Sequence, residues 1–463
     1  MKGRQFAQRT RPSRAWLLAA AAQGTASITN FAAAALALSS GDLAEFGRFS
    51  IAYQLGLVMV SIGEASTGSA ALIQGSREHA DTYRRSVSDG TAGAALVLGA
   101  TMGVPIAIAG VVVGGPLGLA LLLVALGTPG LVSQYTLRGL RFARHDQLGV
   151  LRADSIWLAV VLGVALVDAL SPWRLSPTAY LAVWLAGGTI SAAPLLRVAV
   201  VRGCRQLGVF WQATGPQAVR YGFAGLLSRS VFIVPLIATT IIIGTEATGA
   251  LAAAVVVFSP LSVVNTTAGA ITIPNQIRAL GVHVVDKRIP LQVIAGVSAI
   301  TLGWAGCLLA VEALELPSGP FALSANGITA ALFTATLLRF LGLAFLRGPA
   351  VGLMIADASA ETLDSRIVGT LATWVAAVVG LQLAGVDGGA FGLAVATWFG
   401  AWVTWRRYRS LPRHLLRMPS QPLGGAGSCA AVPARPSESP LAKETSAVSD
   451  LRQLPTERGE FAS

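Results

Sequence analysis

The chain has 463 residues, of which 54% are hydrophobic and only 12% are charged, and its mean hydropathy is +0.65. Soluble domains carry about twice that share of charge, so the composition excludes a soluble protein and predicts one that crosses a membrane many times. The formal net charge of +12 does not indicate nucleic-acid binding, because the basic residues are concentrated in alternate loops between apolar segments.

Twelve apolar segments predict twelve transmembrane helices. A spanning helix needs about 20 apolar residues, so the uncharged run 90–137 holds two helices and the run 247–277 holds one. The first apolar run is too long for a signal peptide and is predicted to be a retained helix. In chain order the predicted helices are residues 15–40, 47–73, 89–112, 115–137, 153–171, 178–198, 219–243, 247–273, 289–311, 321–345, 367–385 and 388–406.

Charge divides the predicted loops into two classes. One class is basic and contains Arg77, Arg84, Arg85, Arg138, Arg141, Arg144, Arg197, Arg202, Arg205, Arg220, Arg278, Lys287, Arg288, Arg347 and Arg366. The opposite class is acidic, with Asp42, Glu45, Glu246, Glu312, Glu315 and Asp387 against the basic residues Arg48 and Arg174. Because Lys and Arg are retained on the cytoplasmic side, we expect both termini to be cytoplasmic.

This topology predicts five regions along the chain. They are a basic cytoplasmic N-terminus (1–14), an N-lobe of six helices (15–198), a cytoplasmic connector (199–218), a C-lobe of six helices (219–408) and a cytoplasmic tail (409–463). From about residue 418 the tail is rich in Pro, Ser, Gly and charge, which predicts disorder.

A short internal repeat relates the two lobes. GEASTGSAALIQ (residues 63–74) aligns without gaps with VNTTAGAITIPN (residues 264–275), 201 positions later, and pairs Glu64 with Asn265. The same offset pairs Arg138 with Arg339. Six helices per copy, starting on the same side, predict two parallel pseudo-symmetric bundles. The predicted fold class is therefore an all-α polytopic membrane protein of twelve transmembrane helices.

Two charged residues fall deep inside predicted helices. Arg229 lies about ten residues into the seventh helix, and Glu64 lies at a comparable depth in the second. Charges at that depth are costly unless they face a cavity, a ligand or each other. Arg229 is a candidate for binding a substrate phosphate, with Glu64 balancing it or carrying a proton or cation. A structural ion pair between the lobes, or snorkelling of Arg229 to the interface, is the alternative.

Other polar residues are weaker cavity candidates. Arg339 falls near the cytoplasmic end of the predicted tenth helix, where snorkelling also explains it. The amides Asn30, Gln54 and Asn265 lie inside predicted helices, where such groups either line a cavity or bond across helices.

Metal, redox and enzyme signatures are lacking. The three cysteines are scattered without a CxxC or Cys/His pairing: Cys204, Cys307 and Cys429. The four histidines lie in predicted loops: His79, His145, His283 and His414. GxSxG, HExxH and Walker motifs are absent, so we expect no metal site, no cofactor and no catalytic residues.

Three segments resemble a known family. They are QGTASITNF, LAEFGRFSIAYQ and YTLRGLRFARHDQLGVLRADSIW. The first two are similar to the first hairpin of the polysaccharide flippases in the multidrug/oligosaccharidyl-lipid/polysaccharide exporter superfamily, with Phe46-Gly47 as the turn. The third resembles the family's loop between helices four and five, with Arg138, Arg141, Arg144, Asp154 and Trp157.

The resemblance implies a plasma-membrane transporter that flips polyprenyl-diphosphate-linked oligosaccharide to the outer leaflet by rocking two bundles. It implies that helices one, two, seven and eight line the cavity, and therefore Asn30, Glu64, Arg229 and Asn265. Relatives often have more than one cavity arginine, whereas only Arg229 is deep here. Expected partners are the glycolipid, membrane lipids, and a polysaccharide polymerase or glycosyltransferases. The alternatives are a drug/cation antiporter of the same superfamily and a non-transporting scaffold of envelope assembly.

Overall fold

The computed structural model describes eight ranges of the chain. They are residues 14–68, 81–144, 146–261, 285–286, 288–314, 321–356, 359–411 and 416–417. Residues 1–418 form one compact unit and residues 419–463 form a second, which lies outside the described residues.

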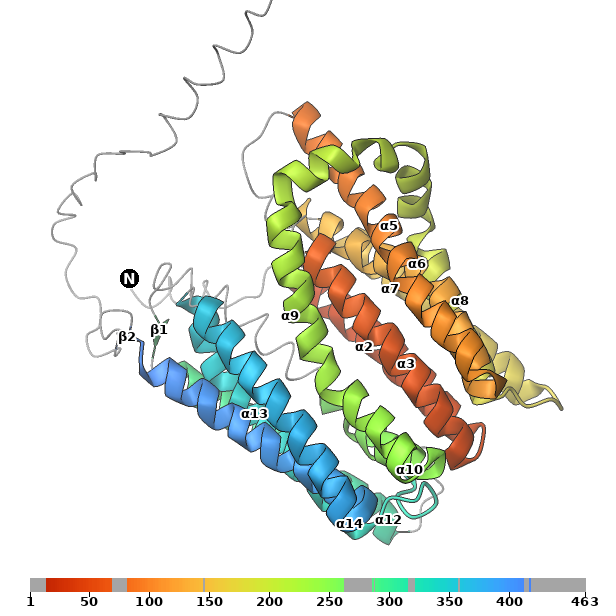
Figure 1. The fold of residues 1–463 in the computed structure, drawn as a ribbon, viewed down its shortest axis with the longest axis vertical. Helices are drawn as coiled ribbons and strands as arrows, with labels where there is room; N and C mark the ends of the chain where they lie inside the picture. Colours follow the sequence, from red (N-terminus) through yellow and green to blue (C-terminus); the bar gives the residue numbers. More distant parts are fainter. Residues whose placement is uncertain are drawn as a thin grey trace, which may run out of the picture. The chain divides into compact units, whose positions relative to one another are not determined.

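The first half of the chain supplies six long helices of the first unit, together with two short helical segments (Figure 1). These are α2 (Arg14–Ser39), α3 (Leu43–Gly63) with the π-helical η1 (Glu64–Gly68), α5 (Asp81–Val113), α6 (Gly115–Ala143), α7 (Gln147–Leu170) and α8 (Pro177–Val201) with the 3₁₀ segment η2 (Gly203–Gln206). Neighbouring pairs such as α5 and α6 pack along each other, and α2 packs against α7. This group is the N-lobe.

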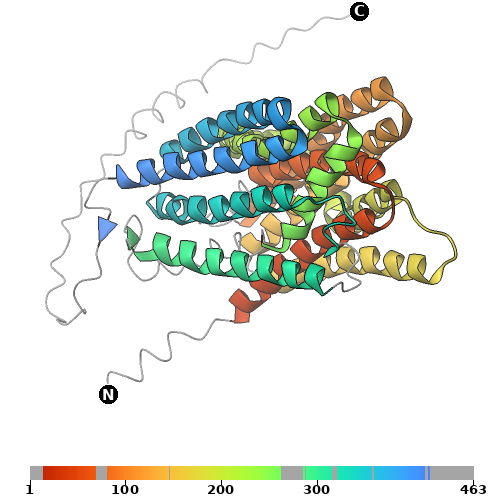
Figure 2. The same ribbon diagram turned by 90° about the horizontal axis from the view of Figure 1, so that it is seen from below.

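The second half continues as the C-lobe. Its described helices are α9 (Leu207–Ile242), α10 (Thr245–Phe258), α12 (Arg288–Ala313), α13 (Ala330–Ile355) and α14 (Ser359–Arg409). Helix α14 is two helices joined at a break, because Gly385 has a φ of +62°, which favours glycine. Helix α13 packs against both α12 and α14, and Figure 2 shows the three as neighbours. The two-residue strands β1 (Val285–Asp286) and β2 (Leu416–Arg417) pair in parallel.

The predicted all-α, twelve-helix architecture is confirmed once α14 is divided at its break. Nine helices in the described part are long and apolar enough to cross a membrane, with α14 counted once and with α2 and the shorter α10 not among them. The chain is thus a multi-pass membrane protein. The orientation of the termini stays a prediction.

Helix ends differ from the sequence-based expectation by several residues. Asp42 caps α3 by accepting a 2.7 Å hydrogen bond from the Glu45 amide, so this helix begins earlier than predicted. Phe46 and Gly47 therefore lie inside α3, and the expectation that they form a turn is wrong. Residues 207–218, assigned to the connector, form the first turns of α9.

The two lobes meet along α3. This helix packs against both α9 and α10 of the C-lobe. At the shared ends of α3 and α10 the backbones touch, because a Cβ at Gly47 would overlap the Thr245 carbonyl and one at Gly249 would overlap that of Leu43. Only glycine permits this approach. Phe31 of α2 also stacks on Phe321, the first residue of the described segment before α13, with ring centroids 5.9 Å apart.

Candidate functional site

A polar network occupies the interior of the N-lobe around Asn30. The Asn30 amide donates to the Tyr135 hydroxyl over 3.4 Å and accepts from the Trp184 indole over 2.9 Å. Its backbone carbonyl accepts from the Tyr53 hydroxyl over 3.0 Å. Four helices, α2, α3, α6 and α8, meet at this residue. Asn30 therefore bonds across helices, and its expected place in a cavity stays a prediction.

A buried ion pair adjoins this network. Arg138 Nη1 of α6 lies 3.0 Å from Asp154 Oδ2 of α7, and the two residues are 6% and 0% exposed. Arg138 Nη2 also donates to Gln23 Oε1 over 2.9 Å. Helix four was predicted to end at residue 137, with Arg138 in a loop, and this is wrong, because α6 continues to Ala143. An arginine at the end of one apolar segment and an aspartate at the start of the next was the signal that could have revealed the pair.

Arg229 lies between the two lobes on α9. It is near the middle of the apolar span Ala218–Ile242 and is exposed. Residues three and four apart on a helix share a face, so Arg229 shares a face with Gly225 and Phe232. Gly225 accepts a hydrogen bond from the Ser61 hydroxyl of α3 over 3.3 Å.

The sequence suggested that Arg339 lies near the cytoplasmic end of its helix, but it does not lie near either end of α13. It lies nine residues, or about 14 Å, after the start of the 26-residue helix α13. Its guanidinium lies over the Phe232 ring, 4.8 Å from the centroid, and the residue is only 9% exposed. Nη1 has no hydrogen-bond partner among the described residues. Snorkelling does not account for a guanidinium buried at this depth.

Two further arginines that were assigned to cytoplasmic loops lie inside helices. Arg347 is in α13 and Arg366 is in α14, because these helices are separated only by residues 356–358. Arg366 donates to the hydroxyl of Ser228, the neighbour of Arg229. Arg347 and Arg366 are close enough for their charges to interact. The apolar residues after Arg347 were the sequence signal for the longer helix.

Glu64 lies on the N-lobe, in the segment that packs against α9, the helix that carries Arg229. It is exposed at the start of η1, and this segment packs against α6 and α9. Gln54 is half-buried on α3, and Asn265 lies outside the described residues.

Four arginines of the C-lobe make up a basic cluster: Arg229, Arg339, Arg347 and Arg366. Arg339 lies over the Phe232 ring, Arg229 lies three residues before Phe232 on α9, and Arg366 donates to the hydroxyl of the residue beside Arg229. Ion pairs between described residues occur elsewhere and do not include Arg229 or Arg339. Guanidinium groups in a region of low dielectric bind phosphate oxygens strongly and with directional hydrogen bonds. The cluster is suited to an anionic phosphate or diphosphate.

No protein-family model and no curated protein sequence matches this chain. Solved structures do. The lipid II flippase MurJ in an inward closed conformation matches with a TM-score of 0.67 and 10% identity, over 86% of this chain and 89% of MurJ. An inward-facing multidrug resistance MATE family transporter of the MOP superfamily matches with a TM-score of 0.58 and 13% identity, over 84% of this chain and 95% of that one.

A MOP superfamily transporter from Pyrococcus furiosus matches with a TM-score of 0.57 and 14% identity, over 85% of this chain and 93% of that one. These likenesses extend over most of each protein. The chain therefore has the fold shared by the MATE transporters and MurJ.

Proposed function

We propose that this chain is a MOP-superfamily transporter that flips polyprenyl-diphosphate-linked oligosaccharide from the cytoplasmic to the outer leaflet. The likeness to MurJ, which extends over 86% of the chain, supports a lipid-linked substrate. The reaction needs no bond to break, so no catalytic group is required. The protein would lie in the plasma membrane with both termini cytoplasmic, as the positive-inside rule favours. A polysaccharide polymerase and glycosyltransferases would act on the same glycan.

The observation that carries this proposal is the buried Arg339 against the Phe232 ring, with Arg229 three residues before Phe232 on the helix that supplies this ring. Arg339 is a buried cation without an ion-pair partner in the described part of the chain, and Arg229 is an exposed one on the neighbouring helix. An unpaired buried charge is costly, so a fold retains it when a ligand uses it. A diphosphate would bind between the two guanidinium groups, and the glycan would cross on the polar side formed by Asn30, Tyr53 and Tyr135.

The contacts at one end of the lobes support alternating access. Leu43 and Gly47 of α3 meet Thr245 and Gly249 of α10 at the ends predicted to face outward. With these ends in contact, the arginine cluster would be reached from the opposite, cytoplasmic side. Rocking of the lobes would separate α3 from α10 and release the glycolipid outward.

Arg339→Leu is expected to lower flipping at least tenfold without lowering stability. A charge-assisted hydrogen bond contributes about 1.5–3 kcal/mol, and each 1.4 kcal/mol is a factor of ten. Leucine preserves the packing and removes an unpaired buried charge, so the apparent melting temperature should be unchanged or higher. Flipping is measured as the inner-leaflet accumulation of polyprenyl-linked glycan in a deletion strain that carries each variant.

The matched control for this prediction is Arg220→Gln, which removes an exposed arginine from the same helix as Arg229. It should rescue the deletion fully, whereas Arg229→Gln should resemble Arg339→Leu. Full rescue by both cluster variants would contradict diphosphate binding at Phe232.

A drug/cation antiporter is the second candidate, and Glu64 is the observation that favours it. This exposed carboxylate lies where η1 meets α6 and α9, and carboxylates in such places bind protons or cations. MATE transporters are also among the proteins that share this fold. No other feature of the described residues favours this alternative.

Glu64→Gln is expected to remove any dependence of transport on the proton gradient and to leave substrate binding intact. The amide has the same size and cannot ionise. Transport in inverted vesicles should be compared with and without an imposed pH gradient, with Glu45→Gln as the control at an exposed carboxylate away from η1. If the gradient still drives Glu64→Gln, coupling through this residue is wrong.

A further inference from the structure

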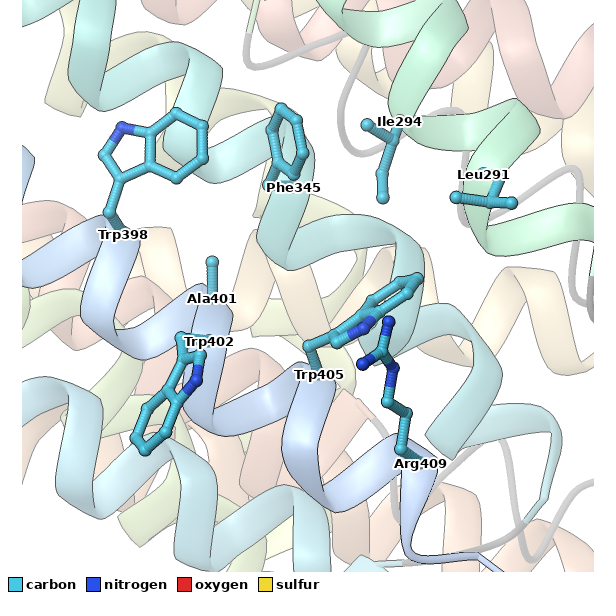
Figure 3. A pocket seen from close by; sticks show the side chains of 8 residues that line it. All are labelled: Leu291, Ile294, Phe345, Trp398, Ala401, Trp402, Trp405 and Arg409. Carbon is cyan, nitrogen blue, oxygen red and sulfur yellow. The ribbon is translucent and has the colours of Figure 1, made fainter.

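A groove with aromatic walls lies on the C-lobe, and its lining includes no residue of the arginine cluster or of the Asn30 network (Figure 3). Its volume is about 320 Å³. It is lined by Leu291 and Ile294 of α12, Phe345 of α13, and Trp398, Ala401, Trp402, Trp405 and Arg409 of α14. Several of these side chains are exposed, including Leu291 at 58% and Trp402 at 55%. These side chains belong to helices long and apolar enough to span a membrane, so acyl chains of the bilayer lie against them.

The α14 side of the groove has the length of one membrane leaflet. Trp398, Trp402, Trp405 and Arg409 recur at intervals of four, three and four residues, so they form one stripe. At 1.5 Å per residue the stripe is about 16 Å long, which is about half of the roughly 30 Å hydrocarbon core. It runs from the basic C-terminal end of α14 toward the middle of the membrane.

The end of the groove at Trp398, toward the middle of the membrane, is held in place by contacts between α13 and α14. The Trp398 indole donates to the Leu338 carbonyl over 2.9 Å, and its ring lies against Phe345 with centroids 4.7 Å apart. The aromatic wall is therefore positioned without a ligand. A flexible chain that enters the groove does not have to order these side chains, which lowers the entropic cost of binding.

The end of the groove at the C-terminus of α14 is basic. Arg409 lies over the Trp405 ring at 5.2 Å and Arg406 over the Trp402 ring at 5.7 Å. Arg407 is ion-paired with Asp364 at 3.7 Å, but no ion pair between described residues includes Arg406 or Arg409. A guanidinium stacked on an indole retains its edge N–H groups as donors to phosphate oxygens.

We propose that the groove binds one acyl chain of an anionic phospholipid of the leaflet at this end of α14, with the lipid phosphate on Arg406 and Arg409. The groove offers apolar walls for the length of one leaflet and two cations at the headgroup level, which is the complement of such a lipid. An interfacial tryptophan belt alone would not distinguish headgroups. The proposal does not depend on what the chain transports.

Native mass spectrometry of the full chain in detergent tests the proposal, with phosphatidylglycerol and phosphatidylcholine as probes. We expect one phosphatidylglycerol to bind more tightly than phosphatidylcholine. The double substitution Arg406→Gln/Arg409→Gln should weaken phosphatidylglycerol binding about tenfold and phosphatidylcholine binding less, because the choline cation of phosphatidylcholine already neutralises its phosphate. Trp405→Leu should weaken both, because it removes a wall of the groove.

The matched control is Arg202→Gln/Arg205→Gln, which removes two exposed arginines at the cytoplasmic end of the N-lobe, away from the groove. It should bind phosphatidylglycerol as the unchanged protein does. Three results would overturn the proposal: equal affinity for the two lipids, an equal loss in the control, or displacement of phosphatidylglycerol by lower concentrations of a polyprenyl phosphate. The last would assign the groove to a polyprenyl chain instead.

Discussion

Replacing Asp154 by alanine is expected to destabilise the N-lobe by about 3–5 kcal/mol. Asp154 is fully buried, and its carboxylate lies 3.0 Å from Arg138 Nη1 and accepts a 2.8 Å hydrogen bond from Gln134 Nε2. Alanine leaves a buried guanidinium without its counter-ion and a buried amide without its acceptor. The apparent melting temperature of the purified protein in detergent should fall by roughly 5 °C or more.

Two variants separate the buried charge from loss of a surface ion pair. Asp364→Ala removes the partner of Arg407 at a pair whose side chains are about half exposed, 57% and 48%, and should cost less than about 1 kcal/mol. Arg138→Leu/Asp154→Leu removes both buried charges and should recover most of the stability. The interpretation is wrong if Asp154→Ala melts like Asp364→Ala, or if the double variant is the least stable of the three.

Valine at Gly249 is expected to shift the lobes away from the state described here. Its Cβ would overlap the Leu43 carbonyl oxygen, which is backbone and cannot rotate away. Overpacking of this kind costs about 1–3 kcal/mol. If the ends of α3 and α10 close and open as we propose, that cost changes the ratio of closed to open molecules by about 5- to 150-fold. Flipping should fall accordingly, because the closed state, in which the ends of α3 and α10 touch, becomes less populated.

The shift is measured with the substitution Ala250→Cys, at a buried position whose side chain lies beside the contact between Gly327 and Leu43. Native Cys204, Cys307 and Cys429 are first replaced by serine. A membrane-impermeant maleimide added to intact cells should label the introduced thiol faster when Gly249→Val is also present. Gly163→Val is the control, because a Cβ there meets no atom within 4 Å. Equal labelling in the two proteins would show that this contact is not a gate.

Much of the fold was predictable from the sequence, because each apolar segment is long enough to form its own helix. Backbone groups in lipid must be bonded within the segment, so helix number follows from local composition. Helix ends were less predictable. Asp42 starts α3 early through a side-chain hydrogen bond, and the Phe46-Gly47 turn was wrong for this reason. The apolar residues that follow Arg347 extend α13 past a charge that had suggested a loop.

The candidate site was predictable only in part. Arg229 was identified because it lies far from any charge-rich loop, and Glu64 for the same reason. Arg339 was identified but assigned to the wrong depth, and Arg138, Arg347 and Arg366 were taken for loop residues. Their positions near apolar boundaries fit either a loop or a helix, and hydropathy alone does not choose between them. Asn265 stays a prediction.

The sequence by itself determined that the chain crosses a membrane many times as helices, and which loops are basic. Those properties depend on local composition, because transfer of apolar side chains into lipid acts on each segment separately. The tertiary structure decided which charges are inside the protein. Arg138 is tolerated because α7 brings Asp154 to it, and Arg339 lies against a ring that α9 supplies. These partners come from distant segments, so only the packing of helices could bring them together.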